Sequence, residues 1–547
     1  MAKTIPQLTD ATTVNAADEL IIQQGGITKR ATGAELAKGL NTINGTVNVK
    51  DFGAVGDGVA NDTAAIQAAF NASNVVYLPK GTYRVTDKIT LPNHAVLYGT
   101  DRHNSSIRVG ADFNMSATGV FAVSAVHEPG PDFRDFEILF EQDTSNNVRA
   151  NVRQYPPAVD LYTVRAGRNK FSRLRITNAW VGLDLRGNNG GTNIQDLEIS
   201  AFHKGVIFDG ALDIVYMSDF HFWPFGCSGT PLESVFADGN TIAGELKNID
   251  GLHAESLFTL FGKFIVDGGF GMINTVMLDS NYANIEFKNG AIYAVGAMYC
   301  STGAVDDFAI RVNGTETRVA VAAMWLINNA DMPTGGLVQI TSATAELIIG
   351  NFHVRTSGDN TSFVYMTDGS LLLDNGFLEP PVGNLFGGRA ADQRAFINVL
   401  GGRLSLTQVR VRDKGGGTGL LIEASASPDR HTVSDLTAPG WTVSFASNTT
   451  DSNFSNNTVA TTNAGSRRVC ATKEFDYSGT LDGSGEAVFA HNLGVGAGNR
   501  FLVVQAWEAD GPWYPLDIDY IDGVNIGVSG GTASATYRAT IQARIPS

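Results

Sequence analysis

A six-residue pattern, apolar-x-x-apolar-x-apolar, recurs at a nearly constant interval and limits the folds that this chain can adopt. Its clearest copies have central residues at 23-residue steps (197 − 174 and 220 − 197) and span 171–176, 194–199 and 217–222. Looser copies occur at 133–138, 246–251 and 273–278. A constant strand core with variable spacing is typical of a solenoid in which each repeat forms one coil. The pattern therefore predicts an all-β chain wound into a parallel β-helix.

Side-chain alternation along a strand assigns the faces of these coils. The apolar residues are expected to point into the stack: Leu174, Ile176, Leu197, Ile199, Phe220 and Phe222. The residues between them are expected to form two outward columns on successive coils. One column contains Arg173, Asp196, Asp219 and Asn248, and the other contains Arg175, Glu198, His221 and Asp250. Because neighbouring strands lie ~4.8 Å apart, we expect the members of a column to be close together.

Composition agrees with such a fold and argues against several classes of protein. The 547 residues include 61 glycines and only 17% charged residues, which suits frequent tight turns between strands. The formal net charge is −16 and no Lys/Arg cluster occurs, so a nucleic-acid partner is not expected. Three widely spaced cysteines, Cys227, Cys300 and Cys470, argue against a disulfide framework or a zinc site. No apolar run approaches ~18 residues, so membrane insertion is not expected.

The chain divides into four segments. Residues 1–46 predict a small head for docking, with one strand and a short helix that Thr32 opens. The β-helix is expected over 47–445, and a polar, turn-rich linker follows over 446–465. Residues 466–547 end in a clear alternation of polar and apolar residues, which predicts a β-sandwich-like domain for trimerisation or glycan binding.

The most distinctive motifs lie where the β-helix would begin. They are DFGAVGDG at 51–58, NDTAAIQAAF at 61–70 and VYLPKGTY at 76–83. Asn61 or Asp62 can cap a helix with one apolar stripe, and such a helix would cover the open end of a solenoid. These motifs resemble the N-terminal signature of the pectate-lyase-like superfamily. With the short head before them, they resemble phage tailspikes and capsule depolymerases of that superfamily.

The resemblance implies a right-handed parallel β-helix, a homotrimer and a place in the virion tail. The N-terminal head would attach to the tail or baseplate, and the partner would be a bacterial surface polysaccharide such as a capsule, an exopolysaccharide or an O-antigen. The first residues lack the apolar segment of a signal peptide, which fits a virion protein released by lysis and fits a cytosolic protein as well. No cofactor and no metal are expected, since no Asp-rich calcium cluster stands out.

Cleavage of a glycosidic bond requires a carboxylic acid and a second carboxylate. In the predicted register Glu198 lies diagonally from Asp219, and Asp219 lies diagonally from Asp250 if no coil intervenes. A second acidic cluster contains Asp250 and Glu255, and Asp279 follows Glu255 by about one coil (279 − 255 = 24). The candidate catalytic residues are therefore Glu198, Asp219, Asp250, Glu255 and Asp279. Each of them could equally be an ordinary solvated acid on the surface.

Four further residues are candidates for substrate binding: Arg175, His221, Trp223 and His253. Trp223 can stack on a sugar ring, or it can pack against a neighbouring subunit. Arg175 could simply form surface ion pairs, which contribute roughly 0–1 kcal/mol each. The sequence favours an endo-acting polysaccharide hydrolase over a lyase. A receptor-binding tail protein without catalysis is the alternative from another functional class.

Overall fold

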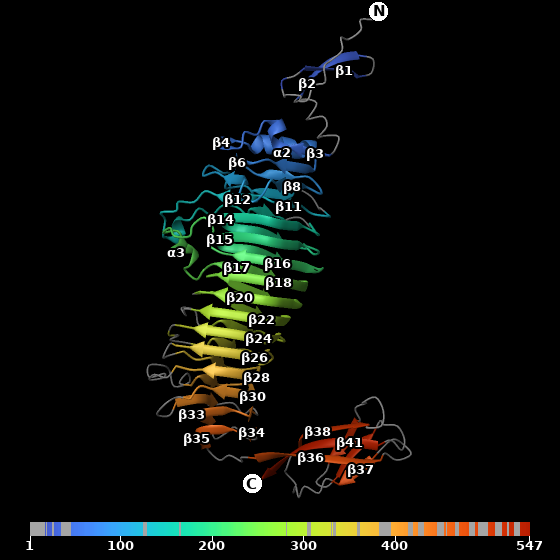
Figure 1. The fold of residues 1–547 in the computed structure, drawn as a ribbon, viewed down its shortest axis with the longest axis vertical. Helices are drawn as coiled ribbons and strands as arrows, with labels where there is room; N and C mark the ends of the chain where they lie inside the picture. The colour runs from blue at the N-terminus through green and yellow to red at the C-terminus, as the bar shows by residue number, and fades with distance from the viewer. Residues whose placement is uncertain are drawn as a thin grey trace, which may run out of the picture. The chain divides into compact units, whose positions relative to one another are not determined.

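The computed structural model divides the chain into two compact units, residues 1–330 and 331–547, and each is described by itself (Figure 1). The structure describes residues 17, 19–24, 27–33, 45–123, 128–162, 166–280, 282–302, 308–329, 331, 335–357, 361–381, 395–413, 419–424, 431–445, 453–455 and 457–464, and the strand backbone at 470–480, 487–490, 501–508, 517–521, 525–529 and 536–546. The helix expected after Thr32 falls outside these residues.

Unit 1 consists almost entirely of strands. Its helical elements are η1 (Val49–Phe52), α2 (Thr63–Ala72), η2 (Arg149–Asn151) and α3 (Glu233–Phe236). Its strands are β1 (Glu19–Gln24), β2 (Ile27–Thr32), β3 (Thr46–Asn48), β4 (Asp57–Asn61), β5 (Val75–Leu78), β6 (Gly81–Val85), β7 (Ile89–Leu91), β8 (Val96–Gly99), β9 (Ser105–Val109), β10 (Phe121–Val123), β11 (Asp132–Arg134), β12 (Glu137–Phe140), β13 (Val159–Asp160), β14 (Lys170–Arg186), β15 (Asn193–Asp209), β16 (Val215–Phe222), β17 (Ile242–Lys247), β18 (Asp250–Leu260), β19 (Lys263–Asp267), β20 (Phe270–Asp279), β21 (Asn284–Lys288), β22 (Ile292–Thr302), β23 (Ile310–Asn313) and β24 (Arg318–Asn328).

Helix α2 lies at the N-terminal end of the coils, as the motif predicts (Figure 1). It buries Ile66, Ala69 and Phe70 against the first strands. The side chain of Asn61 accepts the first helical N–H at 3.1 Å, whereas the carboxylate of Asp62 accepts two N–H groups of the glycine-rich loop before it. The helix thus covers apolar side chains that the first coil would otherwise expose to water.

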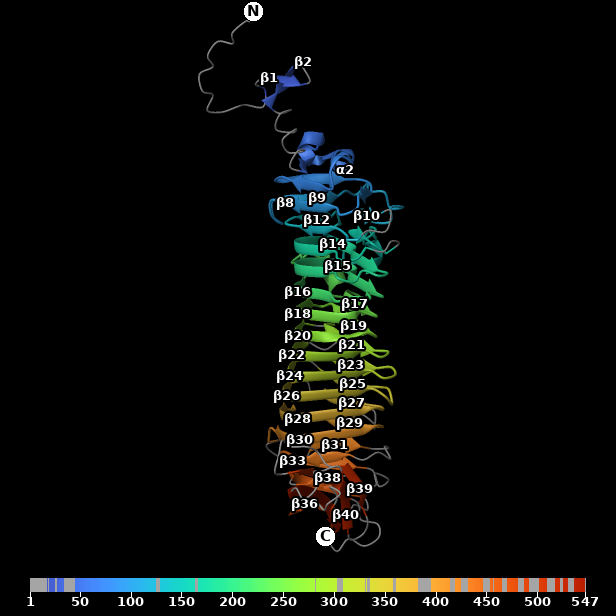
Figure 2. The same cartoon turned by 90° about the vertical axis from the view of Figure 1, so that its right-hand side faces the viewer.

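The coils of unit 1 stack as three parallel sheets (Figure 2). The first sheet runs from β3, β5, β8 and β11 into the first halves of β14 and β15, then through the first halves of β16, β18, β20, β22 and β24. The second sheet continues the same strands after a sharp corner. The third sheet contains β7, β10 and β13, the ends of β14 and β15, and then β17, β19, β21 and β23. The predicted parallel β-helix is therefore confirmed.

The interior of the coils matches the predicted alternation. Leu174 pairs with Leu197 and Leu197 with Phe220, so the 23-residue step is one coil. All six residues that were expected to point inward are at most 1% exposed. The upstream copy at 133–138 is also in the predicted register, because Phe133 pairs with Phe171 and Ile138 with Ile176.

The predicted register fails after Phe222. The next residue in the column of Phe220 is Leu257, and Leu246 lies instead in the third sheet, on β17. An inserted segment that contains α3 lengthens this coil, and the apolar strand pattern occurs on more than one sheet. Asn248 and Asp250 therefore do not belong to the outward columns that the sequence predicts.

Unit 2 continues in the same style and ends in antiparallel sheets. Its parallel strands are β25 (Val338–Ile340), β26 (Glu346–Thr356), β27 (Val364–Met366), β28 (Ser370–Glu379), β29 (Ile397–Val399), β30 (Arg403–Val411), β31 (Gly419–Ala424), β32 (Thr432–Ser434), β33 (Thr437–Phe445), β34 (Asn453–Ser455) and β35 (Thr458–Ala464). The parallel pairing runs through β34 and β35, beyond residue 445 where the sequence places the end of the solenoid.

The last strands form two three-stranded antiparallel sheets, as expected for a β-sandwich-like domain. One sheet has the order β36–β41–β38 and the other has the order β37–β40–β39. Their bounds are β36 (Cys470–Thr480), β37 (Ala487–Ala490), β38 (Phe501–Glu508), β39 (Asp517–Ile521), β40 (Asn525–Ser529) and β41 (Thr536–Pro546). The predicted alternating strand is β41.

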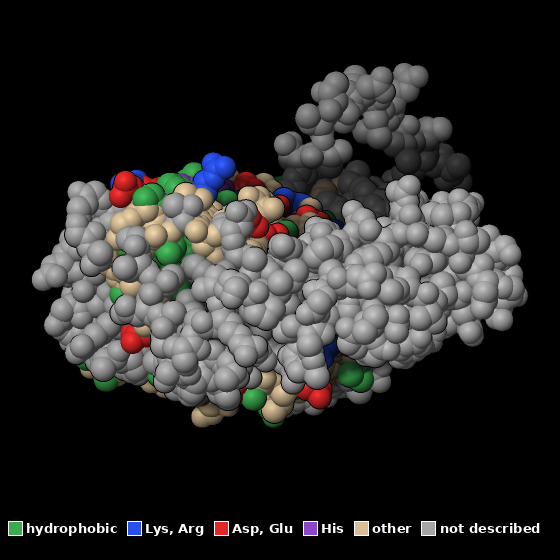
Figure 3. All heavy atoms as spheres, turned by 90° about the horizontal axis from the view of Figure 1, so that it is seen from below, with side chains coloured by type: hydrophobic (Ala, Val, Ile, Leu, Met, Phe, Trp, Pro, Cys, Tyr) green, Lys and Arg blue, Asp and Glu red, His purple; other side chains and the backbone are tan. Residues whose placement is uncertain are grey.

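The surface of the described residues carries charges of both signs. Acidic and basic side chains both lie among the described residues on the face that Figure 3 shows. Among the described residues, no helix has both the length and the apolarity needed to cross a membrane.

Candidate functional site

The outward side chains of interest lie at the corner between the first and second sheets of unit 1. In successive coils the corner position is held by Asp135, Arg173, Asp196, Asp219, Ser256 and Thr275, which we call the corner column. The first four of these residues have φ between 48° and 62°. This left-handed conformation is uncommon for residues other than glycine and makes the chain turn sharply between the two strands. Each corner therefore projects one polar side chain from the stack.

The corner column confirms part of the predicted first outward column. Arg173, Asp196 and Asp219 follow one another on adjacent coils, as the sequence predicts. The fourth member is Ser256 rather than Asn248, and Glu255 lies one residue before it. The second outward column likewise begins with Arg175, Glu198 and His221. Its next member is Phe258 rather than Asp250.

Glu198 is held by two arginines. Arg175 donates to its Oε2 atom at 2.5 Å, and Nη2 of Arg102 lies 3.3 Å from Oε1. Arg102 also binds Asp196 at 2.6 Å, so one guanidinium contacts two acids of the same strand, β15. The Glu198 side chain is 16% exposed. A carboxylate so engaged is positioned to stabilise the coils, because its charge is already neutralised by the chain itself.

Two other acids lie close by: Asp219 at the corner, and Glu255 one residue before the corner on the next coil. Both are exposed, and neither has a Lys, Arg or His within ion-pair distance among the residues that the structure describes. Ser256 links their coils, since its Oγ atom accepts the N–H of Asp219 at 3.1 Å and lies 3.2 Å from Oδ1 of that residue. Asn274 on the following coil donates to Glu255 at 2.7 Å. Two acids thus lie on adjacent coils with their charges available to a ligand.

Two pairs of rings flank these acids on the same two coils. Before the corner, Tyr216 and His253 are register partners with ring centroids 5.7 Å apart. After the corner, His221 and Phe258 are register partners with centroids 4.8 Å apart. Trp223 stacks on Phe258 with centroids 6.2 Å apart, which extends the second pair. Across the corner, these two coils therefore carry a ring pair, then the two acids, then a second ring pair; we call this arrangement the band.

The remaining candidates from the sequence do not join this band. Asp250 begins β18, five positions before Glu255, and pairs with Phe270. Asp279 pairs with Leu260, while the register partner of Glu255 is Asn274, so the expected pairing of Glu255 with Asp279 is wrong. The expected diagonal between Asp219 and Asp250 is wrong for the same reason. The diagonal between Glu198 and Asp219 is present in the register.

The sequence reasoning missed several residues of the site. Arg102 lies in a turn 94 residues before Asp196, and no local pattern connects the two. Tyr216 and Phe258 occupy outward positions that are visible only with the correct register. His221 is half-buried among these rings, and its burial lowers the pKa of the imidazole, which favours the neutral ring.

A second pair of acids lies on the third sheet. Asp160 is the register partner of Asp184, and burial raises the pKa of Asp160. Arg186 binds Asp184 at 2.6 Å and covers the Tyr162 ring at 3.8 Å. Asp160 and Asp184 are only 5% and 4% exposed, so a polysaccharide cannot reach them. We therefore assign this pair to the architecture of the coils. Across the described residues, no cluster of three or more His, Cys, Asp or Glu side chains could hold a metal ion.

Comparison with known proteins identifies the first part of the β-helix. Residues 46–205 match the family model described as rhamnogalacturonase A/epimerase, pectate lyase-like. This segment is similar to that family over the matched residues. The match begins at the first coil and ends within β15.

Curated relatives resemble short parts of the chain. Mannuronan C5-epimerase AlgE5 of Azotobacter vinelandii is 34% identical over 128 residues, which cover 21% of this chain and 13% of the relative. The pre-neck appendage protein of Bacillus phage phi29 is 42% identical over 62 residues, which cover 11% of this chain and 7% of the relative. The chain thus spans a small fraction of the length of these relatives.

Solved structures resemble the chain more extensively and at low identity. Pre-mature gene product 12 of bacteriophage phi29 has a TM-score of 0.43 at 12% identity, and the likeness covers 78% of this chain and 57% of that chain. The tailspike protein gp49 of Pseudomonas phage LKA1 has a TM-score of 0.38 at 10% identity, with 91% and 100% covered. Relatives and structural neighbours therefore include polysaccharide-modifying enzymes and phage tail proteins.

Proposed function

We propose that this protein is a phage tailspike that binds a bacterial surface polysaccharide along its β-helix and hydrolyses it at the corner of unit 1. The observation that carries this proposal is the pair Asp219 and Glu255, two exposed acids on adjacent coils without a cation partner among the described residues. The pectate-lyase-like segment and the phage appendage relative support a polysaccharide substrate and a tail location.

The two acids provide the groups that glycoside hydrolysis requires. One carboxylic acid protonates the oxygen of the leaving sugar, and the other carboxylate attacks the anomeric carbon or activates the water that attacks it. The backbones of adjacent coils are ~4.8 Å apart, and side-chain reach sets the separation of the carboxyl groups between about 5 and 9 Å. The pair is therefore compatible with a retaining and with an inverting mechanism.

The ring pairs on both sides of the acids provide a binding surface. Tyr216 is 45% exposed, and the rings of Trp223 and Phe258 are half-buried. Aromatic faces bury the apolar face of a ligand with a defined geometry, and neighbouring polar groups can bind hydroxyls. A sugar chain that crosses the corner would meet a ring pair, then the acids, then the second ring pair.

Release of reducing ends from purified capsule or O-antigen tests the proposal. Asp219→Asn and Glu255→Gln should each lower the rate by about 10²–10⁴-fold, the usual contribution of a general acid or base. Asp250→Asn is the matched control, because it neutralises another exposed acid on the same strand as Glu255. Full activity in both site variants, or equal loss in the control, would refute the assignment. A product with the ultraviolet absorbance of an unsaturated uronate would replace hydrolysis with elimination.

We further propose that the protein forms a homotrimer through exposed apolar side chains of the first sheet. Phe270, Met272 and Ile292 are 51%, 50% and 52% exposed on β20 and β22. Apolar side chains gathered on a sheet face are usually covered by a partner. Light scattering on the purified chain should give three times the mass of one chain, and Phe270→Lys should lower it. An unchanged monomer mass for the natural chain would reject the trimer.

A further inference from the structure

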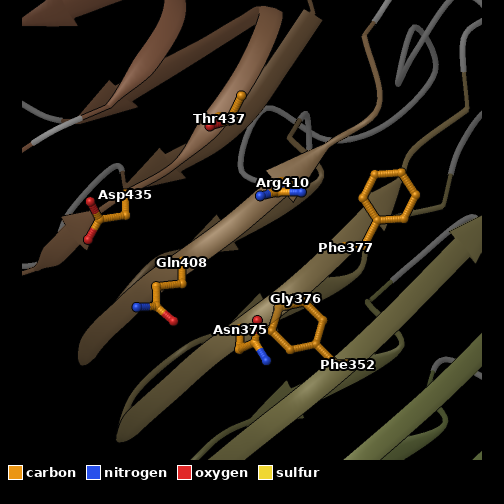
Figure 4. A pocket seen from close by; sticks show the side chains of 8 residues that line it. All are labelled: Phe352, Asn375, Gly376, Phe377, Gln408, Arg410, Asp435 and Thr437. Carbon is orange, nitrogen blue, oxygen red and sulfur yellow. The ribbon is translucent and has the colours of Figure 1, made fainter.

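A cleft lies in unit 2. It has a volume of about 730 Å³, within the range of small-molecule sites, and opens over β28, β30 and β33. Figure 4 shows the eight residues that line it: Phe352, Asn375, Gly376, Phe377, Gln408, Arg410, Asp435 and Thr437.

A glycine at an inward position lets an aromatic ring form the floor of the cleft. Gly376 lies between Phe352 and Val409 in an inward column of register partners. A Cβ atom on Gly376 would lie only 2.0 Å from the Phe352 ring. The ring of Phe352 therefore fills the space beside the glycine and forms an apolar floor, while Phe352 itself is 5% exposed.

The walls of the cleft carry polar groups in two outward columns. Asn375, Gln408 and Asp435 hold the corner position on three successive coils, with φ between 51° and 54°. Phe377, Arg410 and Thr437 hold the second column on the same coils. The cleft thus combines an aromatic face, carboxamides, a hydroxyl, a carboxylate and a guanidinium.

The positive charge of Arg410 is the feature of the cleft that indicates which ligand it binds. Arg412, two residues later on the same side of the chain, binds Glu379, and His353 also contacts that carboxylate at 2.6 Å. Arg410 is exposed and has no ion pair or side-chain hydrogen bond with the residues that the structure describes. Guanidinium groups bind carboxylates in a planar, two-pronged geometry. An exposed guanidinium beside an aromatic ring and two carboxamides suits a sugar that carries a carboxylate.

We propose that this cleft binds a carboxylated sugar residue, such as a uronate, with Arg410 on its carboxylate and Phe377 against its ring. Asn375 and Gln408 bind its hydroxyls. The proposal rests on the proposed function only in taking a glycan as the ligand, because binding here requires no cleavage at Asp219 and Glu255.

Saturation-transfer NMR on the full chain tests this proposal with four probes: glucuronate, galacturonate, glucose and the methyl ester of glucuronate. The two uronates should bind at least about tenfold more tightly than glucose and the methyl ester, and added NaCl should weaken their binding. Arg410→Gln should remove that preference, and Phe377→Leu should weaken all binding. Arg403→Gln is the matched control, since Arg403 is an exposed arginine at the start of the same strand.

The outcomes separate this proposal from the proposed function. Asp219→Asn should abolish cleavage and leave uronate binding unchanged, which assigns the two events to different sites. Equal binding of glucose and glucuronate would reject a carboxylate site, and so would equal loss in Arg403→Gln and Arg410→Gln. No detectable binding of any probe would reject the cleft as a sugar site, even if cleavage by Asp219 and Glu255 is demonstrated.

Discussion

The contacts of Glu198 predict that this acid stabilises the coils rather than acting in catalysis, and a double-mutant cycle can measure this. Arg175 and Glu198 lie 2.5 Å apart with side chains 23% and 16% exposed. A charge-assisted hydrogen bond in such a partly buried position contributes about 1.5–3 kcal/mol. Partial solvent screening places the coupling energy near the lower end, at about 1.5–2 kcal/mol. Glu198→Gln alone should cost more than Arg175→Met alone, because it also leaves Arg102 without one of its two acids.

Hydrogen exchange is the suitable assay because the coils of a solenoid can open locally. Exchange of the amides in β14 and β15 gives the opening free energy of the natural chain, both single variants and the double variant. The exposed pair of Arg30 and Glu19 is the internal control, at 3.1 Å with side chains 75% and 58% exposed. Its coupling energy should be about 0.2–1 kcal/mol. A Glu198 coupling energy no larger than that of the control would refute the structural role and return Glu198 to the catalytic candidates.

Three further predictions concern packing and acidity. Leu197→Ala removes a fully buried side chain and should destabilise its coil by about 2–5 kcal/mol, while Gln195→Ala on the outer face should change stability by less than about 0.5 kcal/mol, both measured by hydrogen exchange. Burial lowers the pKa of His221 in the folded chain, so protonation of this histidine favours the unfolded chain. The free energy of unfolding should therefore be unaffected by His221 above the usual histidine pKa of about 6.5 and should fall as the pH drops below it. His221→Phe should reduce the loss of Tm between pH 7.5 and 5. Burial raises the pKa of Asp160, so the folded chain loses stability as the pH rises above the usual aspartate pKa of 3.8. The variant Asp160→Asn should therefore raise Tm more at pH 7 than at pH 3.5. An equal difference in Tm at the two pH values would contradict this assignment.

The β-helix could be predicted from the sequence because its period is imposed by local packing. Leu174, Leu197 and Phe220 recur at a constant step, since a coil without insertions must return each core residue to the same place. The capping helix was likewise predictable from Asn61 and the apolar stripe that follows it. The parallel coils continue to Ala464 because short polar strands such as β34 can pair without a strong apolar pattern.

The site was only partly predictable, because its members depend on register across an insertion. The segment after Phe222 shifts the next coil, so Leu257 rather than Ile249 follows Phe220. That shift replaced Asn248 with Ser256 in the corner column, brought Glu255 next to the corner and removed Asp250 from the site. Arg102 could not be found from the sequence, because its partners are brought to it by the stacking of coils rather than by a local motif.

The flat third sheet of unit 1 pairs its outward charges between adjacent coils. On the third sheet of unit 1, Glu245 binds Lys204 at 2.6 Å and Lys247 at 3.0 Å. The same sheet pairs Asp267 with Lys288 and Glu286 with Arg311. On a flat parallel sheet, outward side chains on adjacent coils lie side by side, so opposite charges meet readily. At the left-handed corners Arg173 likewise binds Asp135, and Asp196 binds Arg102, whereas Asp219 has no cation partner among the described residues. Asp219 in unit 1 and Asn375, Gln408 and Asp435 in unit 2 share the left-handed conformation, so both proposed sites lie where a strand bends.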